Sequence, residues 1–376
     1  MNQQRAYFVI VLALIISSCS PTEVAEQTIH EKLQTILDEV FTEYNGEGIS
    51  AAVVFPDESA WLGTAHVDGS EPVYSSDLFV IGSITKMYTA TVILQLIEEG
   101  LLNFDDNINQ FLPSYDNIDG NITIKQLLLH TAGVYDFPNH PNYSEMLDED
   151  NSKIWSPDEL VTRMFLEPYF APGEGWRYSS GNYTLLGMII AEITGNRVSK
   201  DFRDRLYHPL GLTSTFLDCE ETITGDIANF WFDVDDDGVP EDISIPFEMR
   251  AAEVSIAYTS GGLFATAEDC ARFTHALLRG DILNSDSMDQ MLDWYTDLPE
   301  GWSNRGYGLG IELLRYSMVN GAEAYGHGGN FYHIAATAYL PEYDVSITTL
   351  LNSQNWALWE KMMNALCQVV MEYYEQ

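Results

Sequence analysis

The stretch Phe79-Val80-Ile81-Gly82-Ser83-Ile84-Thr85-Lys86 opens a long apolar segment that closes at Glu98-Glu99-Gly100. If this segment is a helix, Ser83 and Lys86 stand three positions apart on one face, so the hydroxyl and the amine are neighbours. A serine hydroxyl becomes a useful nucleophile only when a nearby base takes its proton. A lysine packed among apolar side chains loses solvation, its pKa falls, and it can act as that base. The alternative is an N-capping serine followed one turn later by a surface lysine.

Composition indicates a folded and strongly acidic globular protein. The 376 residues are 46% hydrophobic and 12% aromatic, which is enough apolar material for a buried core. The 57 acidic and 17 basic residues give a formal net charge of −40. This balance argues against nucleic acid as a partner and against electrostatic docking on anionic lipid. We interpret the acidity as a solvated, soluble surface.

The N-terminus has the pattern of an export signal, which we assign to residues 1–19. Arg5 supplies the positive charge, and the apolar run that follows is too short to span a bilayer as a helix. Ile16-Ser17-Ser18-Cys19 resembles the lipobox of bacterial lipoproteins, in which the cysteine is lipidated and becomes the mature N-terminus. We therefore expect an exported, periplasmic protein anchored to the outer membrane through Cys19, with residues 20–27 as a linker. The alternative is a simple signal peptide whose cleavage removes the cysteine.

Three further cysteines are widely spaced along the chain, at Cys219, Cys270 and Cys367. No C-x-x-C pair is present, so the sequence contains neither a zinc knuckle nor a redox motif. One disulfide in an oxidising compartment and three buried thiols both fit this spacing.

An acidic stretch resembles the first half of a calcium-binding loop. Asp233, Asp235 and Asp237 place oxygen ligands at positions one, three and five, and Gly238 stands at position six. Position twelve is Ser244 instead of a bidentate glutamate. The stretch is therefore either a structural calcium site or an acidic turn between two apolar segments.

The order of the predicted elements indicates the fold class. A capping box of Thr28 and Glu31 begins the first helix. Helices are predicted over 28–44, 83–99, 122–133, from 156, over 184–194, from 266 and over 356–373. Strands are predicted over 49–55, 61–67, 253–264 (around the flexible Ser260-Gly261-Gly262), 307–316, 324–327, 334–340 and 345–351. A polar loop over 135–156 would form a lid or rim.

This order predicts an α+β fold. An antiparallel sheet is flanked by the N- and C-terminal helices, and a mainly α-helical domain is inserted into it. We expect one hydrolase domain over residues 28–376. Its sheet part covers about 28–82 and 253–376, and its helical part covers about 83–252.

Three separated motifs together resemble a known family. They are Ser83-x-x-Lys86, Tyr178 on a turn before a helix, and Gly326-His327-Gly328-Gly329-Asn330 at the start of a predicted strand. In this order and spacing they resemble the penicillin-recognising serine hydrolases, the superfamily of class C β-lactamases, DD-peptidases and related esterases. The resemblance covers the chain from about residue 30 onward and implies the β-lactamase/transpeptidase-like fold. Three further short segments fit the class C-like branch. They are Leu-Leu-Leu-His-Thr-Ala-Gly ending at Gly133, Tyr-Thr-Leu-Leu-Gly ending at Gly187, and Ser-Gly-Gly-Leu ending at Leu263.

The resemblance also implies a role for each motif. Ser83 would be the acylated nucleophile, with Lys86 as its proton partner. Tyr178 would shuttle protons between Ser83 and the leaving group. The backbone N–H groups of Ser83 and Asn330 would form the oxyanion hole. Which of Lys86 and Tyr178 is the base for each step stays open, and no cofactor is required for catalysis.

Two motifs depart from the family pattern. The family's Tyr-x-Asn reads Tyr178-Ser179-Ser180, so the expected amide is missing, and Asn182 two residues later is a candidate to replace it. The family's Lys-Thr-Gly reads His327-Gly328-Gly329, and a histidine need not be charged at pH 7, which weakens recognition of a substrate carboxylate. Tyr178 as a core tyrosine and His327 as a structural histidine are the alternatives. The expected substrate-binding residues are Ser180, Asn182, Gly328 and Gly329.

These motifs predict an exported serine hydrolase that forms an acyl-enzyme at Ser83. The expected partner is a small-molecule or peptidoglycan-peptide substrate with an ester or amide bond, such as a D-alanyl peptide, a β-lactam or a small carboxylic ester. The departures at Ser180 and His327 support a competing hypothesis, a penicillin- or peptidoglycan-binding sensor without turnover. The sequence leaves the oligomeric state open. It contains neither a G-x-S-x-G elbow nor H-E-x-x-H, so the hydrolase families that carry these motifs fit it poorly.

Overall fold

The computed structural model describes residues 27–67, 70–233, 240–243 and 247–376. At its centre is a seven-stranded antiparallel sheet with the strand order β2-β1-β12-β11-β10-β9-β8. The two ends of the chain meet in this sheet, because β1 pairs with β12 from Ile49↔Leu351 to Val54↔Ser346. The strands are β1 (Gly48–Val54), β2 (Ala60–His66), β8 (Gly306–Tyr307), β9 (Glu312–Leu313), β10 (Tyr325–Phe331), β11 (His333–Leu340) and β12 (Val345–Leu351).

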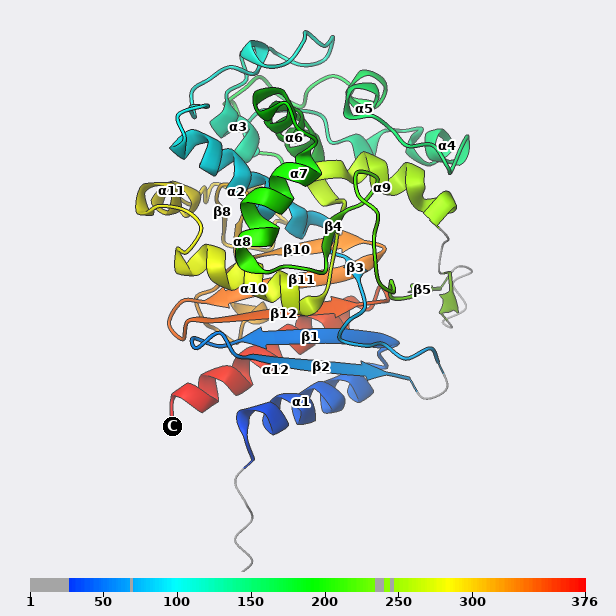
Figure 1. Ribbon diagram of the computed structural model, residues 1–376, viewed down its shortest axis with the longest axis vertical. Helices are drawn as coiled ribbons and strands as arrows, with labels where there is room; N and C mark the ends of the chain where they lie inside the picture. The colour runs from blue at the N-terminus through cyan, green and yellow to red at the C-terminus, as the bar shows by residue number, and fades with distance from the viewer. Residues whose placement is uncertain (1–26, 68–69, 234–239, 244–246) are drawn as a thin grey trace, which may run out of the picture.

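The terminal helices α1 (Ile29–Glu43) and α12 (Trp356–Tyr374) lie together on one face of this sheet (Figure 1). The capping box predicted for α1 is present, since the Thr28 hydroxyl accepts from the Glu31 N–H while the Glu31 carboxylate accepts from the Thr28 N–H. The apolar faces of the two helices share one core with the sheet. This arrangement confirms the predicted α+β class.

The opposite face carries α10 (Ala267–Arg279), which packs on β1, β11 and β12, and beyond it the helical part of the molecule (Figure 1). As predicted, Thr266 caps α10 by accepting from the Asp269 N–H. The remaining α-helices are α2 (Thr85–Glu98), α3 (Ile124–Leu128), α4 (Tyr143–Asp148), α5 (Pro157–Met164), α6 (Ser180–Thr194), α7 (Val198–Phe202), α8 (His208–Leu210), α9 (Phe247–Gly261) and α11 (Ser285–Met291). Single helical turns are η1 (Gly82–Ile84), η2 (Ile108–Gln110), η3 (Phe137–Asn139), η4 (Arg203–Tyr207) and η5 (Tyr316–Met318).

A second, three-stranded sheet delivers the chain to the start of α2. Its order is β3 (Phe79–Val80), β7 (Leu263–Ala265) and β4 (Thr215–Leu217). The Ile81 N–H continues the pairing by donating to the Leu263 carbonyl at 2.9 Å. The chain then turns at Gly82, whose φ of +51° favours glycine, and enters η1 and α2. A third pair, β5 (Trp231–Phe232) and β6 (Glu241–Asp242), stands apart.

The strand predicted over 253–264 is wrong. Most of it belongs to helix α9, and only the three residues of β7 after it are extended. Helix α9 begins before this segment and contains Ala251, Ala252 and Ala257, which favour a helix, whereas the prediction weighted the flexible Ser-Gly-Gly. The helix is kinked at Tyr258, whose φ of 38° and ψ of −130° are not helical.

Three further boundaries differ from the prediction. The helix expected over 122–133 is reduced to the five residues of α3, because the chain turns at His130 with a φ of +61°. The strand expected over 307–316 becomes the short strands β8 and β9, separated by a turn at Gly310 with a φ of +77°. The loop expected over 135–156 contains η3 and α4.

Some predictions concern residues that the structure does not describe. Asp235, Asp237 and Cys19 lie outside the described residues, so the calcium loop and the lipid anchor stay predictions. Within the described ranges, no group of three or more His, Cys, Asp or Glu side chains could hold a metal ion. No described helix combines the length and apolar character needed to cross a bilayer. Cys270 and Cys367 are free and buried, so no disulfide joins them to each other or to Cys219.

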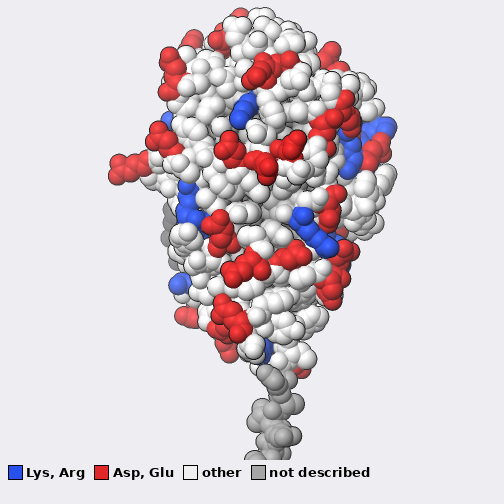
Figure 2. All heavy atoms as spheres, turned by 90° about the vertical axis from the view of Figure 1, so that its left-hand side faces the viewer, with Lys and Arg blue, Asp and Glu red and all other residues white. Residues whose placement is uncertain are grey.

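Acidic side chains greatly outnumber basic ones on the face of the molecule in Figure 2. Many of the basic side chains pair with acidic neighbours, but 17 basic residues are too few to balance 57 acidic ones. Such pairs include Lys153–Glu159, Arg203–Glu221, Arg272–Glu268, Arg305–Glu323 and Arg315–Glu360.

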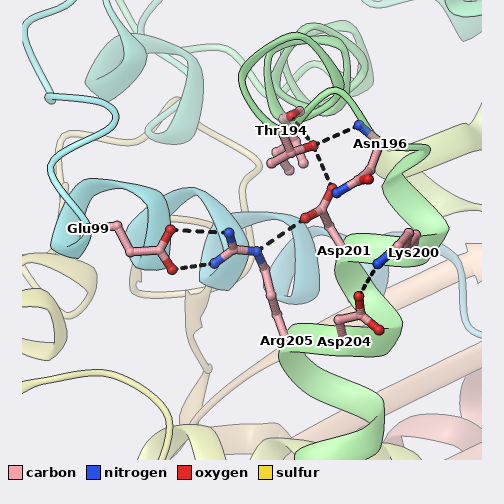
Figure 3. A network of polar contacts seen from close by, with 8 residues as sticks. Glu99, Thr194, Asn196, Lys200, Asp201, Asp204 and Arg205 are labelled. Carbon is pink, nitrogen blue, oxygen red and sulfur yellow. Dashed lines mark hydrogen bonds and ion pairs between the residues drawn. The ribbon is translucent and has the colours of Figure 1, made fainter.

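One network of this kind joins four helical elements, α2, α6, α7 and η4 (Figure 3). Arg205 on η4 donates to both carboxylate oxygens of Glu99, at the end of α2, over 2.6 and 3.1 Å. Its Nε donates to the buried carboxylate of Asp201 on α7 at 3.2 Å. The Thr194 hydroxyl at the end of α6 donates to the same carboxylate at 2.7 Å. The network therefore fixes the ends of α2 and α6 against α7 and η4.

Candidate active site

Ser83 and Lys86 are neighbours at the start of α2, as their spacing predicts. The Lys86 Nζ lies 3.0 Å from the Ser83 Oγ and donates to the Ser260 carbonyl at 2.7 Å. The lysine is fully buried, which contradicts the alternative of a surface lysine. Burial lowers the pKa of Lys86 to about 7, although the carboxylates of Asp136 and Glu312 act in the opposite direction. A large share of this amine is therefore neutral near pH 7 and able to accept a proton.

Tyr178 lies against the same pair. Its hydroxyl is hydrogen-bonded to the Ser83 side chain, and the Lys86 Nζ is 4.8 Å from its ring centroid. Burial raises the pKa of Tyr178 well above its usual value. The phenol is therefore protonated at neutral pH and can donate a proton. The ring is held between His130 and Trp302, at centroid distances of 4.4 and 5.4 Å.

His130 packs against the Tyr178 ring and binds the backbone of the turn that carries it. The Ser179 N–H donates to its Nδ1 at 3.2 Å, and the Asn182 side-chain amide lies 2.9 Å from the same nitrogen. Burial lowers the pKa of His130 well below its usual value, so the ring is neutral. Asn182 is fully buried in this contact and does not reach the cleft. The structure thus places Asn182 against His130 and apart from the other expected substrate-binding residues, Ser180, Gly328 and Gly329, which line the cleft.

The strand β10 runs directly against the turn that carries Ser83. A Cβ placed on Gly82 would come within 2.8 Å of the Asn330 nitrogen, and one on Gly329 would meet the Ile81 carbonyl oxygen at 2.0 Å. The absence of both side chains lets two stretches of backbone approach closely. The Ser83 and Asn330 backbones therefore line the same cleft, as an oxyanion hole formed by their N–H groups requires.

His327 faces the cleft from β10 and is 2% exposed. Its Nδ1 donates to the Gly328 carbonyl at 2.6 Å, because a carbonyl only accepts. Its Nε2 lies 3.2 Å from the Tyr307 hydroxyl. Burial is the main cause that lowers the pKa of His327, so the ring is neutral at pH 7.

Two carboxylates near Ser83 and Lys86 were not predicted from the sequence. Asp136 accepts from the Ser180 N–H at 2.8 Å, and burial raises its pKa. Glu312 on β9 accepts from the Gly328 N–H at 3.1 Å and is 6% exposed. Neither belongs to a motif, and only the folded chain places them near Lys86. The position of Asp136 at the head of the predicted rim was the one available signal.

The cleft has two lobes that meet at Ser83 and Asn330. The larger, of about 480 Å³, we call the polar lobe, and it is lined by His327, Gly328, Gly329, Trp302, Glu312, Arg315, Trp356 and Trp359. The smaller, of about 150 Å³, we call the apolar lobe, and it is lined by Ser180 together with Phe137, Pro138, Tyr143, Ile256 and Phe331. The segment predicted as a rim thus forms one wall of the apolar lobe. All four motif side chains, Ser83, Lys86, Tyr178 and His327, gather at this cleft.

Known structures resemble this one over nearly their whole length. The D-amino acid amidase of Ochrobactrum anthropi SV3, solved with L-phenylalanine amide, is 25% identical with a TM-score of 0.78, and the match covers 92% of this chain and 98% of that one. A D-stereospecific amidohydrolase from Streptomyces sp. is 28% identical with a TM-score of 0.74, covering 91% and 97%.

Curated relatives match over shorter stretches. A putative penicillin-binding protein PbpX of Bacillus subtilis is 26% identical over 261 residues, or 65% of this chain and 59% of the relative. A putative D-alanyl-D-alanine carboxypeptidase of Escherichia coli is 33% identical over 173 residues, or 42% and 39%. The chain thus spans about half the length of such relatives. The family model described as Beta-lactamase matches residues 33–365, and the chain therefore belongs to the beta-lactamase family.

Proposed function

We propose that the protein is a serine hydrolase that forms an acyl-enzyme at Ser83 with an amide or ester substrate. The observation that carries the proposal is the 3.0 Å contact between the Ser83 Oγ and the Nζ of the fully buried Lys86. The amidases and carboxypeptidase among the relatives favour an amide of a D-amino acid or a D-alanyl peptide. A small carboxylic ester and a β-lactam are the other substrates to test.

In the acylation step, the Ser83 Oγ attacks the substrate carbonyl carbon while neutral Lys86 takes its proton. The negative charge that develops on the carbonyl oxygen is stabilised by the N–H groups of Ser83 and Asn330. Lys86 is the base in this step because burial holds its pKa near 7, whereas the Tyr178 phenol keeps its proton.

The leaving group then needs a proton before it departs. Tyr178 is hydrogen-bonded to Ser83 and adjacent to Lys86, so it can donate its proton to the leaving nitrogen or oxygen and receive one from protonated Lys86. In deacylation a water attacks the acyl carbon and the same groups act in reverse, returning a proton to the Ser83 Oγ.

Intact-mass analysis and product analysis test this function. The protein is incubated with D-phenylalanine amide, a D-Ala-D-Ala peptide, a p-nitrophenyl ester and a penicillin. We expect turnover of at least one amide or ester, with loss of turnover in Ser83→Ala. Ser285→Ala removes an exposed hydroxyl at the start of α11, outside both lobes of the cleft, and we expect it to stay active. A stable adduct on Ser83 without turnover would favour the binding or sensor hypothesis. Equal reaction in Ser83→Ala would overturn both.

We also propose that the chain is exported and held in the outer membrane by a lipid on Cys19. The charged start, the apolar run and the lipobox-like sequence support this. Metabolic labelling with an alkyne fatty acid in a Gram-negative host tests it. We expect the label in membranes from the wild type and its loss in Cys19→Ala, and an unlabelled wild type would contradict the proposal.

A further inference from the structure

The polar lobe places one buried carboxylate among aromatic rings. Glu312 is 6% exposed, and its Oε2 accepts from the Gly328 N–H at 3.1 Å. Trp302, Trp356 and Trp359 line the same lobe. Aromatic rings attract cations, and the guanidinium of Arg315 already lies 5.8 Å from the centroid of the Trp359 ring.

No cationic side chain neutralises Glu312 among the described residues. The nearest basic group is the His327 Nδ1 at 3.9 Å, but its proton is donated to the Gly328 carbonyl and the ring is neutral. The Lys86 amine is engaged by Ser83 and Ser260.

Arg315 also lines the polar lobe, but its positive charge is already paired with a carboxylate. Its guanidinium lies 3.1 Å from the Glu360 carboxylate and donates to the Ser303 hydroxyl at 2.8 Å. The lobe therefore favours positive charge, and a substrate carboxylate would meet Glu312 beside an uncharged histidine.

We infer that the polar lobe binds a protonated amine carried by the substrate, and that Glu312 selects it. An ammonium group placed there gains a charge-assisted hydrogen bond to Glu312 and contact with tryptophan rings. This inference rests on the proposed function. It narrows the substrate to an amide or ester with an ammonium group on one side of its carbonyl.

The apolar lobe accounts for the other side of such a substrate. Among the described residues, none with a charged side chain lines it, and Phe137, Ile256 and Phe331 provide apolar surface. Both lobes meet at Ser83, so a carbonyl at the nucleophile extends into each. The expected substrate is therefore apolar at one end and cationic at the other.

Three phenylboronic acids that differ only in their meta substituent test the inference. The substituents are aminomethyl, ethyl and carboxyl, which are cationic, neutral and anionic at pH 7.5. The Ser83 oxygen adds to the trigonal boron, its proton passes to Lys86, and a reversible tetrahedral adduct results. Inhibition constants are measured against hydrolysis of a p-nitrophenyl ester. We expect the wild type to bind the aminomethyl compound at least about tenfold more tightly than the carboxyl compound.

Glu312→Gln keeps the shape of the side chain and removes its charge. We expect this variant to bring the two constants within about threefold of each other. Glu372→Gln is the matched control, because it removes one negative charge from α12 about 20 Å along the helix from Trp359. It should keep the wild-type ratio, which separates Glu312 from the net charge of the whole protein.

Several outcomes would overturn the inference. They are equal binding of the charged compounds by the wild type, and a preference that survives in Glu312→Gln. If Glu312→Gln does not fold, a crystal structure of the wild-type aminomethyl adduct decides, since an ammonium group away from Glu312 refutes the assignment. Failure of all three compounds to bind would instead refute the proposed nucleophile, and the inference with it.

Discussion

The Lys86 amine experiences two opposing effects on its pKa. Burial lowers the value to about 7, while the carboxylate of Asp136, followed by that of Glu312, raises it. If neutral Lys86 is the base in acylation, kcat/KM rises with pH through about 7 and levels off above it. Removing the Asp136 charge lowers the pKa of Lys86 further, so the amine becomes neutral at lower pH.

We therefore predict that Asp136→Asn shifts the acid limb of the kcat/KM profile to lower pH, by about one unit or less. The asparagine oxygen can still accept from the Ser180 N–H, which preserves the turn. Asp38→Asn, an exposed change on α1 beyond the sheet, is the control for charge alone and should leave the limb in place. A limb that stays in place in Asp136→Asn, or moves to higher pH, would contradict this role for Lys86.

Gly329 permits the close approach of β10 to the nucleophile turn. An alanine methyl at this position would lie 2.0 Å from the Ile81 carbonyl oxygen, so the backbone that carries the Asn330 N–H has to move. Loss of one oxyanion donor costs about 100-fold or more in kcat. We predict a fall of this size for Gly329→Ala in the turnover of a p-nitrophenyl ester.

Gly195→Ala is the control for this prediction. Gly195 ends α6 in a left-handed conformation with open space around it, so the alanine causes strain without a clash. It should lower thermal stability slightly and leave turnover within about twofold. A Gly329→Ala protein with normal kcat would show that the position of β10 does not set the rate.

The side chains that meet at the cleft could be predicted from the sequence because each belongs to a short local pattern. Ser83 and Lys86 are three residues apart on one turn, and His327 stands among glycines that the close backbone contact requires. Asp136 and Glu312 could not be predicted in this way. A single carboxylate acquires its role from neighbours that lie far away in sequence, and only tertiary packing supplies them.

At the level of elements, capping chemistry predicts boundaries well. Thr28, Ser156 and Thr266 each accept a backbone N–H at the start of the helix that the sequence predicts there. The prediction for residues 253–264 failed because the backbone there is irregular and its contacts are distant in sequence. The kink at Tyr258 leaves the Ser260 carbonyl to accept from Lys86 and the Thr259 carbonyl to accept from Thr89. These partners lie about 170 residues away in sequence, so no local pattern encodes the kink.

The Arg205 network in Figure 3 joins elements, and its loss has a predictable cost. Arg205 compensates the Asp201 carboxylate, which is only 4% exposed, and it holds Glu99 at the end of α2. Arg205→Ala leaves Asp201 buried without this partner. We predict a loss of about 1–3 kcal/mol in the free energy of unfolding, measured by urea denaturation.

Lys200 offers a matched comparison within the same picture. It pairs with Asp204, but both side chains are about half exposed and water replaces the contact readily. Lys200→Ala should therefore leave the free energy of unfolding close to that of the wild type. Equal losses for the two variants would show that the network does not join the helices as we describe.

At the level of the whole molecule, the order of elements was enough to predict the fold. Strands at both ends of the chain can complete one sheet only if the termini meet, and β1 and β12 do pair. The cleft lies where β10 of the large sheet meets the end of the small sheet and the start of α2. Its lobes could not be predicted, because their walls come from five or more segments whose relative positions depend on the complete fold.

The acidic surplus also acts on the whole molecule. With 57 acidic and 17 basic residues, many of the latter already paired, surface carboxylates repel one another more strongly in the compact folded state than in the unfolded chain. Salt screens this repulsion, with a Debye length that falls from about 30 Å at 0.01 M to below 10 Å above 0.15 M. We predict that the unfolding midpoint rises by roughly 2 °C or more between about 0.01 and 0.5 M NaCl.

Guanidinium chloride below about 0.3 M should also raise the unfolding midpoint, because this denaturant is a salt, whereas the same concentration of uncharged urea should lower it. A midpoint that falls with NaCl, or equal effects of guanidinium chloride and urea, would mean that attractive ion pairs such as Arg205–Glu99 outweigh the repulsion among unpaired carboxylates.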